Sequence, residues 1–482
     1  MFGKIMRIFN ISLLLAMAAM SPFVMASSEE NEELINYLNA IEGMVATASE
    51  AQRNEGYLSI DVEYIQPVDH DHPTGEKFTQ KISLFHKSKN SPMILKTRGY
   101  SMSWYSLGLF SQEKQANQLS VEHRYYGGSI PESYNQDYLN IEQASEDLHR
   151  IVSAIRPFYE GKWLSTGSSK GGMTAMFYRY FYPNDVDATL ANVAPLSIGR
   201  KDFRYDYFVR QVGTEQCRAK IMDAQRMMLQ SRQEIKDYLA TITWHEFTYE
   251  KMGYDNALDY AVAEFYFQFF QYFPVSYCEE LPVAGSSIED LVNQILLMLY
   301  QNSDSKFADG DAYAYQAYTQ LGHPKLPTEH IDDLLRSDPN DYSNYMENPP
   351  SSDVFDYSMI PVMFWTFTQA NNVMTFYGDN DPWSAAKFPI YNSVSRDNHT
   401  YNIAEGTHSS SIYSLEGEEK VAADSVIDRW LGIETVQTLN KLNSDKTLLG
   451  SKEKNQTDRH LKYPKKINSV EQLERLIETY KN

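Results

Sequence analysis

The residues best suited to chemistry surround Ser169, in a segment from Gly167 to Gly171 that has the pattern G-x-S-x-G. The segment follows a short apolar run at Trp163 to Thr166, so we expect it to link a strand to a helix. In this context, the pattern predicts a strained turn that exposes a serine hydroxyl above the edge of a sheet. The N-terminus of the helix then offers N–H groups to an oxyanion. The pattern therefore predicts that Ser169 is a nucleophile.

Ser168 is the competing nucleophile, but it lies one position off the frame of the turn. A glycine-rich turn without chemistry is the other explanation of the pattern. Partner residues distinguish these explanations, because a serine hydroxyl is a poor nucleophile until a histidine takes its proton. A carboxylate must in turn orient that histidine.

The orienting acid is expected after the serine in the chain. A strand predicted at Asn372 to Tyr377 runs into a tight turn that contains Asp379 and Asp381. Aspartates in such turns also form Asx turns without any chemical role. Glu405 is a further candidate for the carboxylate. We favour Asp381 as the acid, with the other two carboxylates as alternatives.

The histidine is expected last, on a loop past the following strand. A strand predicted at Thr400 to Ile403 is followed by a loop that contains His408. An ordinary surface histidine is the alternative. Because the three residue types occur in the expected order and context, we predict the catalytic set Ser169, Asp381 and His408.

Backbone N–H groups are expected to stabilise the oxyanion. The first is that of Lys170, directly after the serine. The second is expected from the loop after the strand Pro92 to Thr97, where Gly99 and Tyr100 are the candidates.

The elements around these residues alternate between strand and helix. This alternation predicts a mostly parallel sheet with helices on both faces, and together with the catalytic set it predicts an α/β-hydrolase fold. Other expected strands lie at Tyr57 to Ile65, Phe78 to Phe85, Gln118 to Glu122 and Ala188 to Val193, and expected helices lie at Ile141 to Ile155, Gly171 to Tyr182 and Val421 to Leu431.

The chain of 482 residues is long enough for a core domain and a large insertion. An aromatic and mainly helical stretch interrupts the alternation and predicts a cap. Residues 27–54 have a polar, helical pattern, and the polar tail is expected to be loosely attached. The predicted parts are a signal peptide at 1–26, the hydrolase domain at 27–200 and 351–434, the cap at 201–350 and the tail at 435–482.

The first residues have the pattern of an export signal, with Lys4 and Arg7 before an apolar run and a cleavage site that ends at Ala26. An uncleaved anchor is the alternative, although the run is short for a bilayer span. We therefore expect a periplasmic or extracellular protein. In such a compartment Cys217 and Cys278 either pair or remain as two buried thiols, and the sequence leaves both possibilities open.

The formal net charge of −21 disfavours contact with nucleic acid and with anionic lipid. We expect no nucleic-acid partner and no stable membrane association once the signal is removed. Metal-ligand spacings, a phosphate loop and a dinucleotide fingerprint are all missing from the sequence, so we expect neither a metal nor a cofactor. The oligomeric state is not predicted.

Four groups of motifs together are specific, although each alone is not. They are Gln66-Pro-Val-Asp69-His70 with Phe78-Thr-Gln80, then Val121-Glu-His-Arg-Tyr-Tyr-Gly127, then Gly167-Ser-Ser-Lys-Gly-Gly172-Met173, and then Asp381-Pro-Trp383 with Gly406-Thr-His408. A chain with these motifs resembles the bacterial prolyl tri- and tetrapeptidyl aminopeptidases, which are relatives of lysosomal Pro-X carboxypeptidase and dipeptidyl peptidase II. The resemblance implies removal of short peptides from free N-termini after proline, and it implies that Asp381 is the acid.

Such substrates make two demands on the site. Proline needs a flat apolar pocket, for which Trp383 is a candidate. A free α-amino group needs a carboxylate from the cap, and Glu264, Glu279 and Glu280 remain equal candidates. An exported esterase or lipase and an inactive hydrolase-fold binding protein are the alternative functions.

Overall fold

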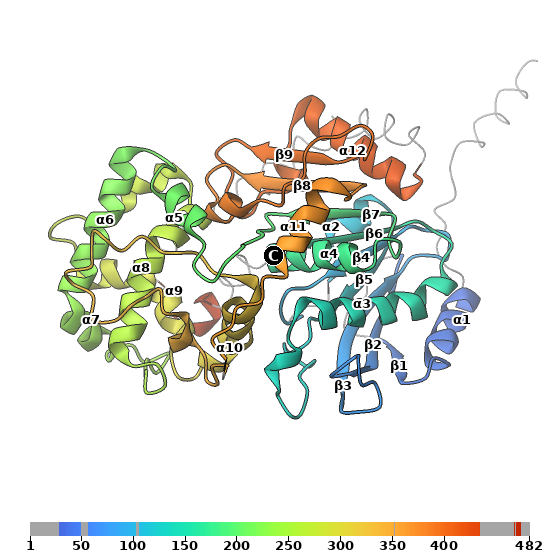
Figure 1. Ribbon diagram of the computed structural model, residues 1–482, viewed down its shortest axis with the longest axis horizontal. Helices are drawn as coiled ribbons and strands as arrows, with labels where there is room; N and C mark the ends of the chain where they lie inside the picture. Colours follow the sequence, from blue (N-terminus) through green and yellow to red (C-terminus); the bar gives the residue numbers. More distant parts are fainter. Residues whose placement is uncertain are drawn as a thin grey trace, which may run out of the picture.

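The computed structural model describes residues 28–49, 56–102, 106–350, 352–433, 467 and 469–473. Two parts lie side by side in Figure 1, a twisted sheet flanked by helices and a bundle of helices. The strands of the sheet come from a chain segment that ends at Asn192 and from one that begins at Val373, and the helices from Phe203 to Tyr345, between these segments, form the bundle. The bundle is therefore an insertion into the sheet part, and we call it the cap (Phe203 to Tyr345).

Nine strands of the described chain form one sheet. They are β1 Met44–Ala48, β2 Leu58–Pro67, β3 Lys77–His86, β4 Met93–Thr97, β5 Asn117–Val121, β6 Trp163–Ser168, β7 Ala188–Asn192, β8 Val373–Gly378 and β9 His399–Ile403. The strand order is β1-β2-β3-β5-β4-β6-β7-β8-β9. The pairings from β1 to β5 are antiparallel, and those from β5 to β9 are parallel. Because parallel strands place their carboxyl ends at one edge, the loops after β4, β6, β8 and β9 meet there.

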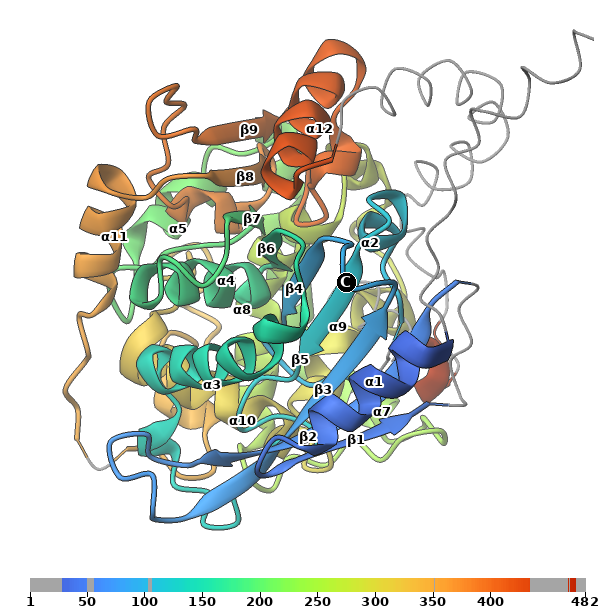
Figure 2. The same ribbon diagram turned by 90° about the vertical axis from the view of Figure 1, so that its right-hand side faces the viewer.

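Helices cover both faces of the sheet (Figure 2). Successive side chains of β4 point to opposite faces of the sheet. Ile94 packs on the face covered by α12, whereas Leu95 packs on the face covered by α3. The helix α3 begins after Asn140, whose side chain accepts a hydrogen bond from the N–H of Gln143. These helices are α1 Ser28–Asn39, α2 Leu109–Glu113, α3 Ile141–Ile155, α4 Lys170–Phe181, α11 Met359–Thr368 and α12 Gly417–Leu431. This arrangement is the α/β-hydrolase fold that the sequence predicts.

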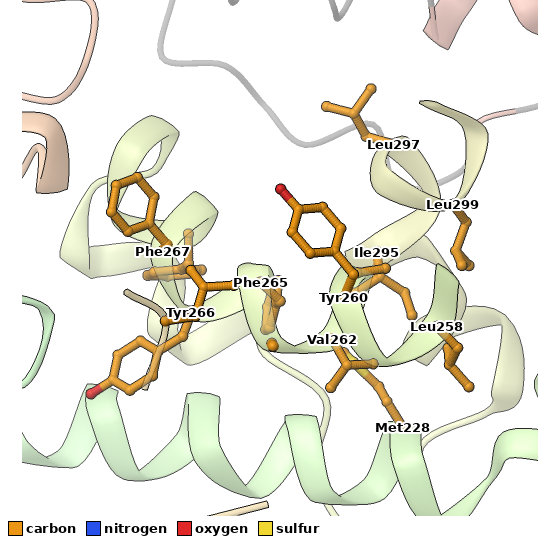
Figure 3. Close-up of a cluster of buried hydrophobic side chains, with 14 of the residues drawn as sticks. Met228, Leu258, Tyr260, Val262, Phe265, Tyr266, Phe267, Ile295, Leu297 and Leu299 are labelled. Carbon is orange, nitrogen blue, oxygen red and sulfur yellow. The ribbon is translucent and has the colours of Figure 1, made fainter. Parts of the chain in front are cut away.

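The cap has its own hydrophobic core, built around the helix α8 (Figure 3). Leu258 and Val262 of α8 pack against Met228 of α6 and Ile295 of α9 in this core. Although α8 has 19 residues, the described part of the chain contains no helix that is both long and apolar enough to cross a membrane. The helices of the cap are α5 Phe203–Val209, α6 Glu215–Gln230, α7 Arg232–Leu239, α8 Tyr254–Tyr272, α9 Ile288–Gln301 and α10 Phe307–Gln316.

Two segments differ from the sequence-based expectation. The helical pattern expected at residues 27–54 ends with α1, and the edge strand β1 follows, antiparallel to β2. Its Met44 and Ala46 are buried, because the short strand lies with alternate side chains against the sheet core. The helix α11 was not predicted, because its residues are almost all apolar and hide the helical period.

The predicted export signal, residues 1–26, lies outside the described residues, as does most of the predicted tail, residues 435–482. Within the tail, Ile467 and Leu473 are buried in the hydrophobic core of the cap. The expectation of a loosely attached tail is therefore wrong for this short stretch, whose apolar side chains pack onto the cap.

A disulfide between Cys217 of α6 and Cys278 of the short helix η3 (Val275–Glu280) joins two segments of the cap. Their Cα atoms lie 5.3 Å apart, and the bond closes a loop with a sequence separation of 61. The pairing that the sequence left open is therefore present in the structure.

Removing this disulfide is expected to destabilise the cap. The double variant Cys217→Ala/Cys278→Ala should lower the free energy of unfolding by roughly 2–4 kcal/mol, because the unfolded chain regains loop entropy. Thermal unfolding with and without dithiothreitol measures this effect. The wild type should lose stability on reduction and the double variant should not. A wild-type melting temperature that dithiothreitol does not change would contradict the prediction.

Candidate active site

Ser169 stands between the end of β6 and the start of α4 (Lys170–Phe181), with φ +53° and ψ −126°. A non-glycine residue rarely adopts such a positive φ, and its presence here marks a strained turn. The backbone N–H of Ser169 donates to the carbonyl of Asn192 at the end of β7, at 2.9 Å. This bond fixes the turn at the carboxyl edge of the sheet.

The glycines around this turn are required by close packing. A Cβ atom on Gly167 would lie 2.3 Å from the carbonyl carbon of Gly171. One on Gly171 would lie 2.7 Å from the carbonyl oxygen of Thr97. Real Cβ atoms do not approach so closely, so a side chain at either position would push the helix away from the sheet.

The two adjacent serines occupy different backbone environments. Ser168 is the last residue of β6, and its hydroxyl lies 3.4 Å from the side-chain nitrogen of Asn192. Ser169 is the residue in the strained conformation, where a nucleophile is exposed above the sheet. The geometry favours Ser169 over Ser168 as the nucleophile.

His408 and Asp381 form a buried pair. The imidazole Nδ1 lies 2.8 Å from Asp381 Oδ2, and the two side chains are 3% and 0% exposed. The other carboxylate oxygen of Asp381 accepts the N–H of Trp383 at 3.1 Å. A carboxylate that binds Nδ1–H fixes the tautomer and leaves Nε2 available to accept a proton.

The loops that carry this pair are packed tightly against each other and against the cap. A Cβ atom on Gly378, at the end of β8, would lie 2.4 Å from the carbonyl oxygen of Gly406. The backbone N–H of His408 donates to the carbonyl of Gln271, near the C-terminal end of α8, at 2.8 Å. The cap therefore takes part in positioning the histidine loop.

The loop from Arg98 to Tyr100 lies against the first turn of α4. A Cβ atom on Gly99 would lie 2.6 Å from Lys170 Cβ and 2.7 Å from the backbone nitrogen of Gly171. The side-chain Nζ of Lys170 donates to the carbonyl of Gly99 at 2.6 Å. The two segments predicted to supply the oxyanion donors are therefore in direct contact.

Trp383 links the acid loop to the aromatic core of the cap. Its ring centroid lies 5.1 Å from that of Phe267, 5.5 Å from that of Tyr205 and 6.1 Å from that of His408. The indole Nε1 is buried and has no hydrogen-bond partner in the described part of the chain. The predicted substrate residue Trp383 is thus part of an apolar wall beside the histidine.

Glu264 lies on α8 among tyrosines. Burial raises the pKa of Glu264 to about 7, and a hydrogen bond from Tyr260 opposes this increase. The carboxylate atom Oε2 is buried without a hydrogen-bond partner among the described residues. Burial is also the main cause that raises the pKa of Tyr272, with smaller contributions from Tyr100, Glu264 and Asp381. Tyr272 is therefore near three groups of the site: Glu264 of the cap, Tyr100 of the oxyanion loop and the orienting acid Asp381.

The other predicted carboxylates are solvent-exposed. Glu279 is 74% exposed and forms an ion pair with Lys220, with 2.7 Å between their charged atoms. Glu280, Asp379 and Glu405 are also exposed. The structure does not bring these carboxylates into the buried group around His408. Among the three glutamates proposed for a substrate amine, only Glu264 shares a buried environment with the catalytic candidates.

Some residues of the site were not predicted. Tyr205, Phe267 and Tyr272 line it from the cap, and the side chain of Lys170 contacts the oxyanion loop. The aromatic cluster in α8 was visible in the sequence. Its orientation was not, because it depends on how the cap packs on the sheet.

Comparisons with known proteins indicate the family of the chain. The sequence model of the PS-10 peptidase S37 family matches residues 30–458. The chain is 33% identical over 387 residues to the prolyl tri/tetrapeptidyl aminopeptidase of Streptomyces mobaraensis. The alignment covers 79% of this chain and 81% of that protein. It is 30% identical over 116 residues to lysosomal Pro-X carboxypeptidase of Bos taurus, covering 22% and 23% of the two chains.

Among solved structures, the proline iminopeptidase of Mycobacterium smegmatis is similar at a TM-score of 0.36 and 11% identity, covering 77% of this chain and 99% of that chain. This similarity is too weak to bear on function. The match of the family model over most of the chain and the long alignment with the Streptomyces protein confirm the resemblance inferred from the motifs. The chain therefore belongs to the PS-10 peptidase S37 family, and it is a serine peptidase with an α/β-hydrolase fold.

Proposed function

We propose that this serine peptidase removes short peptides, of three or four residues, from free N-termini and prefers proline before the scissile bond. The observation that carries the proposal is the buried carboxylate of Glu264, whose Oε2 has no partner among the described residues. An unpaired buried carboxylate is costly unless a cation neutralises it, and an N-terminal ammonium group is such a cation. The alignment with the Streptomyces aminopeptidase supports the peptide length and the proline preference.

The proposed reaction is acyl transfer through Ser169. His408 Nε2 takes the proton of the serine hydroxyl as the oxygen attacks the peptide carbonyl, and Asp381 orients the imidazole. The backbone N–H of Lys170 and one from Gly99 or Tyr100 stabilise the oxyanion. His408 then returns the proton to the leaving amine, and water hydrolyses the acyl-enzyme by the reverse sequence.

The cap accounts for the exopeptidase character. With the ammonium group held at Glu264 and the carbonyl at Ser169, the span between them limits the number of residues that fit. The wall formed by Trp383, Phe267 and Tyr205 offers a proline ring a flat apolar surface. The cap also restricts entry, so that peptide ends are accepted and folded chains are excluded.

The affinity for peptides should depend on the ionisation of Glu264. Its pKa is raised to about 7, so the carboxyl is neutral in acid and charged above neutrality. A bound ammonium favours the charged form, so the Kd of a tripeptide ending in proline should rise about tenfold per pH unit as the pH falls below 7. Calorimetry on the Ser169→Ala variant between pH 5.5 and 7.5 measures this without turnover.

Glu264→Gln in the same Ser169→Ala background is the control for this pH dependence. It removes the titrating group and keeps the volume of the side chain. Its Kd should change less than about twofold over the same range, because the substrate amine, with an ordinary pKa of about 7.7 to 8.0, stays mostly protonated there. An equal pH slope in both proteins would assign the titration to another group and contradict the role of Glu264.

Mapping the products of a peptide library by mass spectrometry tests the proposed function. We expect tri- or tetrapeptides that end in proline, released from free N-termini and not from N-acetylated copies of the same peptides. Hydrolysis of short-chain esters without peptide cleavage would instead indicate an esterase. Neither activity, together with no labelling by a fluorophosphonate, would indicate an inactive binding protein.

We also propose that the protein is exported. The charged and apolar pattern of residues 1–26 supports this, and so does the disulfide between Cys217 and Cys278, which is typical of an oxidising compartment. Fractionation of the source cells followed by N-terminal sequencing should find a periplasmic or extracellular protein that begins at Ser27. A cytoplasmic protein with an intact N-terminus would contradict export.

A further inference from the structure

Lys170, the residue that follows the proposed nucleophile in the chain, has a buried side chain. Lys170 is the first residue of α4 and is 3% exposed. No carboxylate in the described part of the chain pairs with its Nζ, and burial alone holds the pKa of this amine well below its usual range. Burial of an amine without an acidic partner is costly, so an ion pair does not explain why a lysine occupies this position.

The contacts of Nζ are a carbonyl and two aromatic rings. It donates to the carbonyl of Gly99 at 2.6 Å and lies 4.8 Å from the ring centre of Tyr126 and 5.4 Å from that of Tyr100. The two rings pack against the end of the flexible lysine side chain and restrict where its amine can lie. The amine is therefore directed at one atom of the loop expected to form the oxyanion hole.

This loop is anchored to β5 and its continuation by separate bonds. The carbonyl of Tyr100 accepts the backbone N–H of His123 at 3.3 Å, and the N–H of Met102 donates to Glu122 Oε1 at 2.8 Å. These bonds fix the far end of the loop to the sheet. Its near end is fixed to β5 by the N–H of Arg98, which donates to the carbonyl of Val121 at 3.2 Å. Between these anchors, the bond from Lys170 ties the carbonyl of Gly99 to the helix that begins after Ser169.

We propose that the Nζ of Lys170 is a positioning group for the oxyanion hole, and this inference rests on the acyl transfer proposed above. In a planar trans peptide the carbonyl and the N–H point in opposite directions. By holding the carbonyl of Gly99, the amine sets the direction of the N–H of Tyr100 on the same peptide unit. Lys170 thus supplies one oxyanion donor from its backbone and orients the other through its side chain.

Substitution of Lys170 with methionine tests this role. Lys170→Met keeps the backbone N–H and most of the side-chain volume and removes the donor to Gly99. We expect kcat to fall roughly 10- to 100-fold. The loss should not exceed that caused by removing a complete oxyanion donor, because the N–H of Tyr100 is still present and only its orientation is affected. KM should stay within about twofold and the melting temperature should not fall, because a buried unpaired amine is removed. Both a peptide and a short-chain ester are used as substrates.

Lys87→Met is the matched control. Lys87 is also buried and lies 4.9 Å from the ring centre of Tyr57, but it is placed after β3, near the start of β5 and away from the carboxyl edge of the sheet. Its substitution should leave kcat unchanged.

The outcomes separate this inference from the proposed function. A Lys170→Met enzyme that keeps wild-type kcat on both substrates overturns the positioning role and leaves the acyl transfer intact. A loss of kcat matched by a lower melting temperature, or by an equal change in KM, assigns Lys170 a structural role and also overturns it. A wild type without turnover or fluorophosphonate labelling overturns both proposals.

Discussion

The Ser169→Ala variant is expected to lose peptide hydrolysis by a factor of at least about 10⁴ in kcat, because no acyl-enzyme can form without the hydroxyl. Substrate affinity should be retained, since the ammonium site and the aromatic wall are unchanged. The melting temperature should also be retained, because the strained backbone is held by the bond to Asn192 and by the packing of Gly167 and Gly171. Kinetics on a proline-containing tripeptide amide, with calorimetry on the variant, measure both quantities.

Ser168→Ala is the matched control for this experiment. It makes the same chemical change one residue earlier, at the end of β6. Activity should remain within a few-fold of the wild type, since this hydroxyl faces Asn192. If Ser168→Ala were inactive and Ser169→Ala active, the assignment of the nucleophile would be reversed.

The Glu264→Gln variant should lose roughly 30- to 700-fold in kcat/KM on peptides with a free N-terminus. Loss of one partner of a buried charge pair costs about 2–4 kcal/mol, and every 1.4 kcal/mol is a factor of ten. Hydrolysis of a simple ester, which has no ammonium group, should be unchanged. Stability should not fall, because the substitution removes a carboxylate that burial already disfavours.

Glu279→Gln provides the comparison for Glu264. Glu279 belongs to the same cap, but it is exposed and paired with Lys220. Its substitution should leave kcat/KM unchanged, because surface ion pairs contribute little. Equal effects of the two substitutions, or a loss of ester hydrolysis in Glu264→Gln, would contradict a specific role of Glu264 in binding the N-terminus.

Local sequence was sufficient to predict the sheet domain and the loops at its carboxyl edge that carry Ser169, Asp381 and His408. The turn around Ser169 could be recognised because its glycines, strand and helix are contiguous in the chain. Asp381 and His408 could be placed because each follows a predicted strand, and the ends of parallel strands meet at one edge. The observed pairing of His408 with Asp381 agrees with that expectation.

The cap side of the site could not be predicted in the same way. The sequence gives no reason to choose among Glu264, Glu279 and Glu280. They differ in burial only once the chain has folded, because α8 packs inside the protein whereas the glutamates of η3 remain exposed to solvent. The side chain of Lys170 was also missed. A lysine at the start of a helix is ordinarily exposed. This one is buried because the loop that contains Gly99 packs closely against it, and the sequence does not reveal that contact.

The most direct test of acyl transfer at Ser169 is the position of a fluorophosphonate adduct on the wild-type protein. Trypsin should release residues 163–170 as one peptide that contains both Ser168 and Ser169, and fragment ions distinguish the two serines. We predict a single adduct on Ser169. An adduct on Ser168 or on a residue elsewhere, or no adduct on a protein that cleaves peptides, would contradict it.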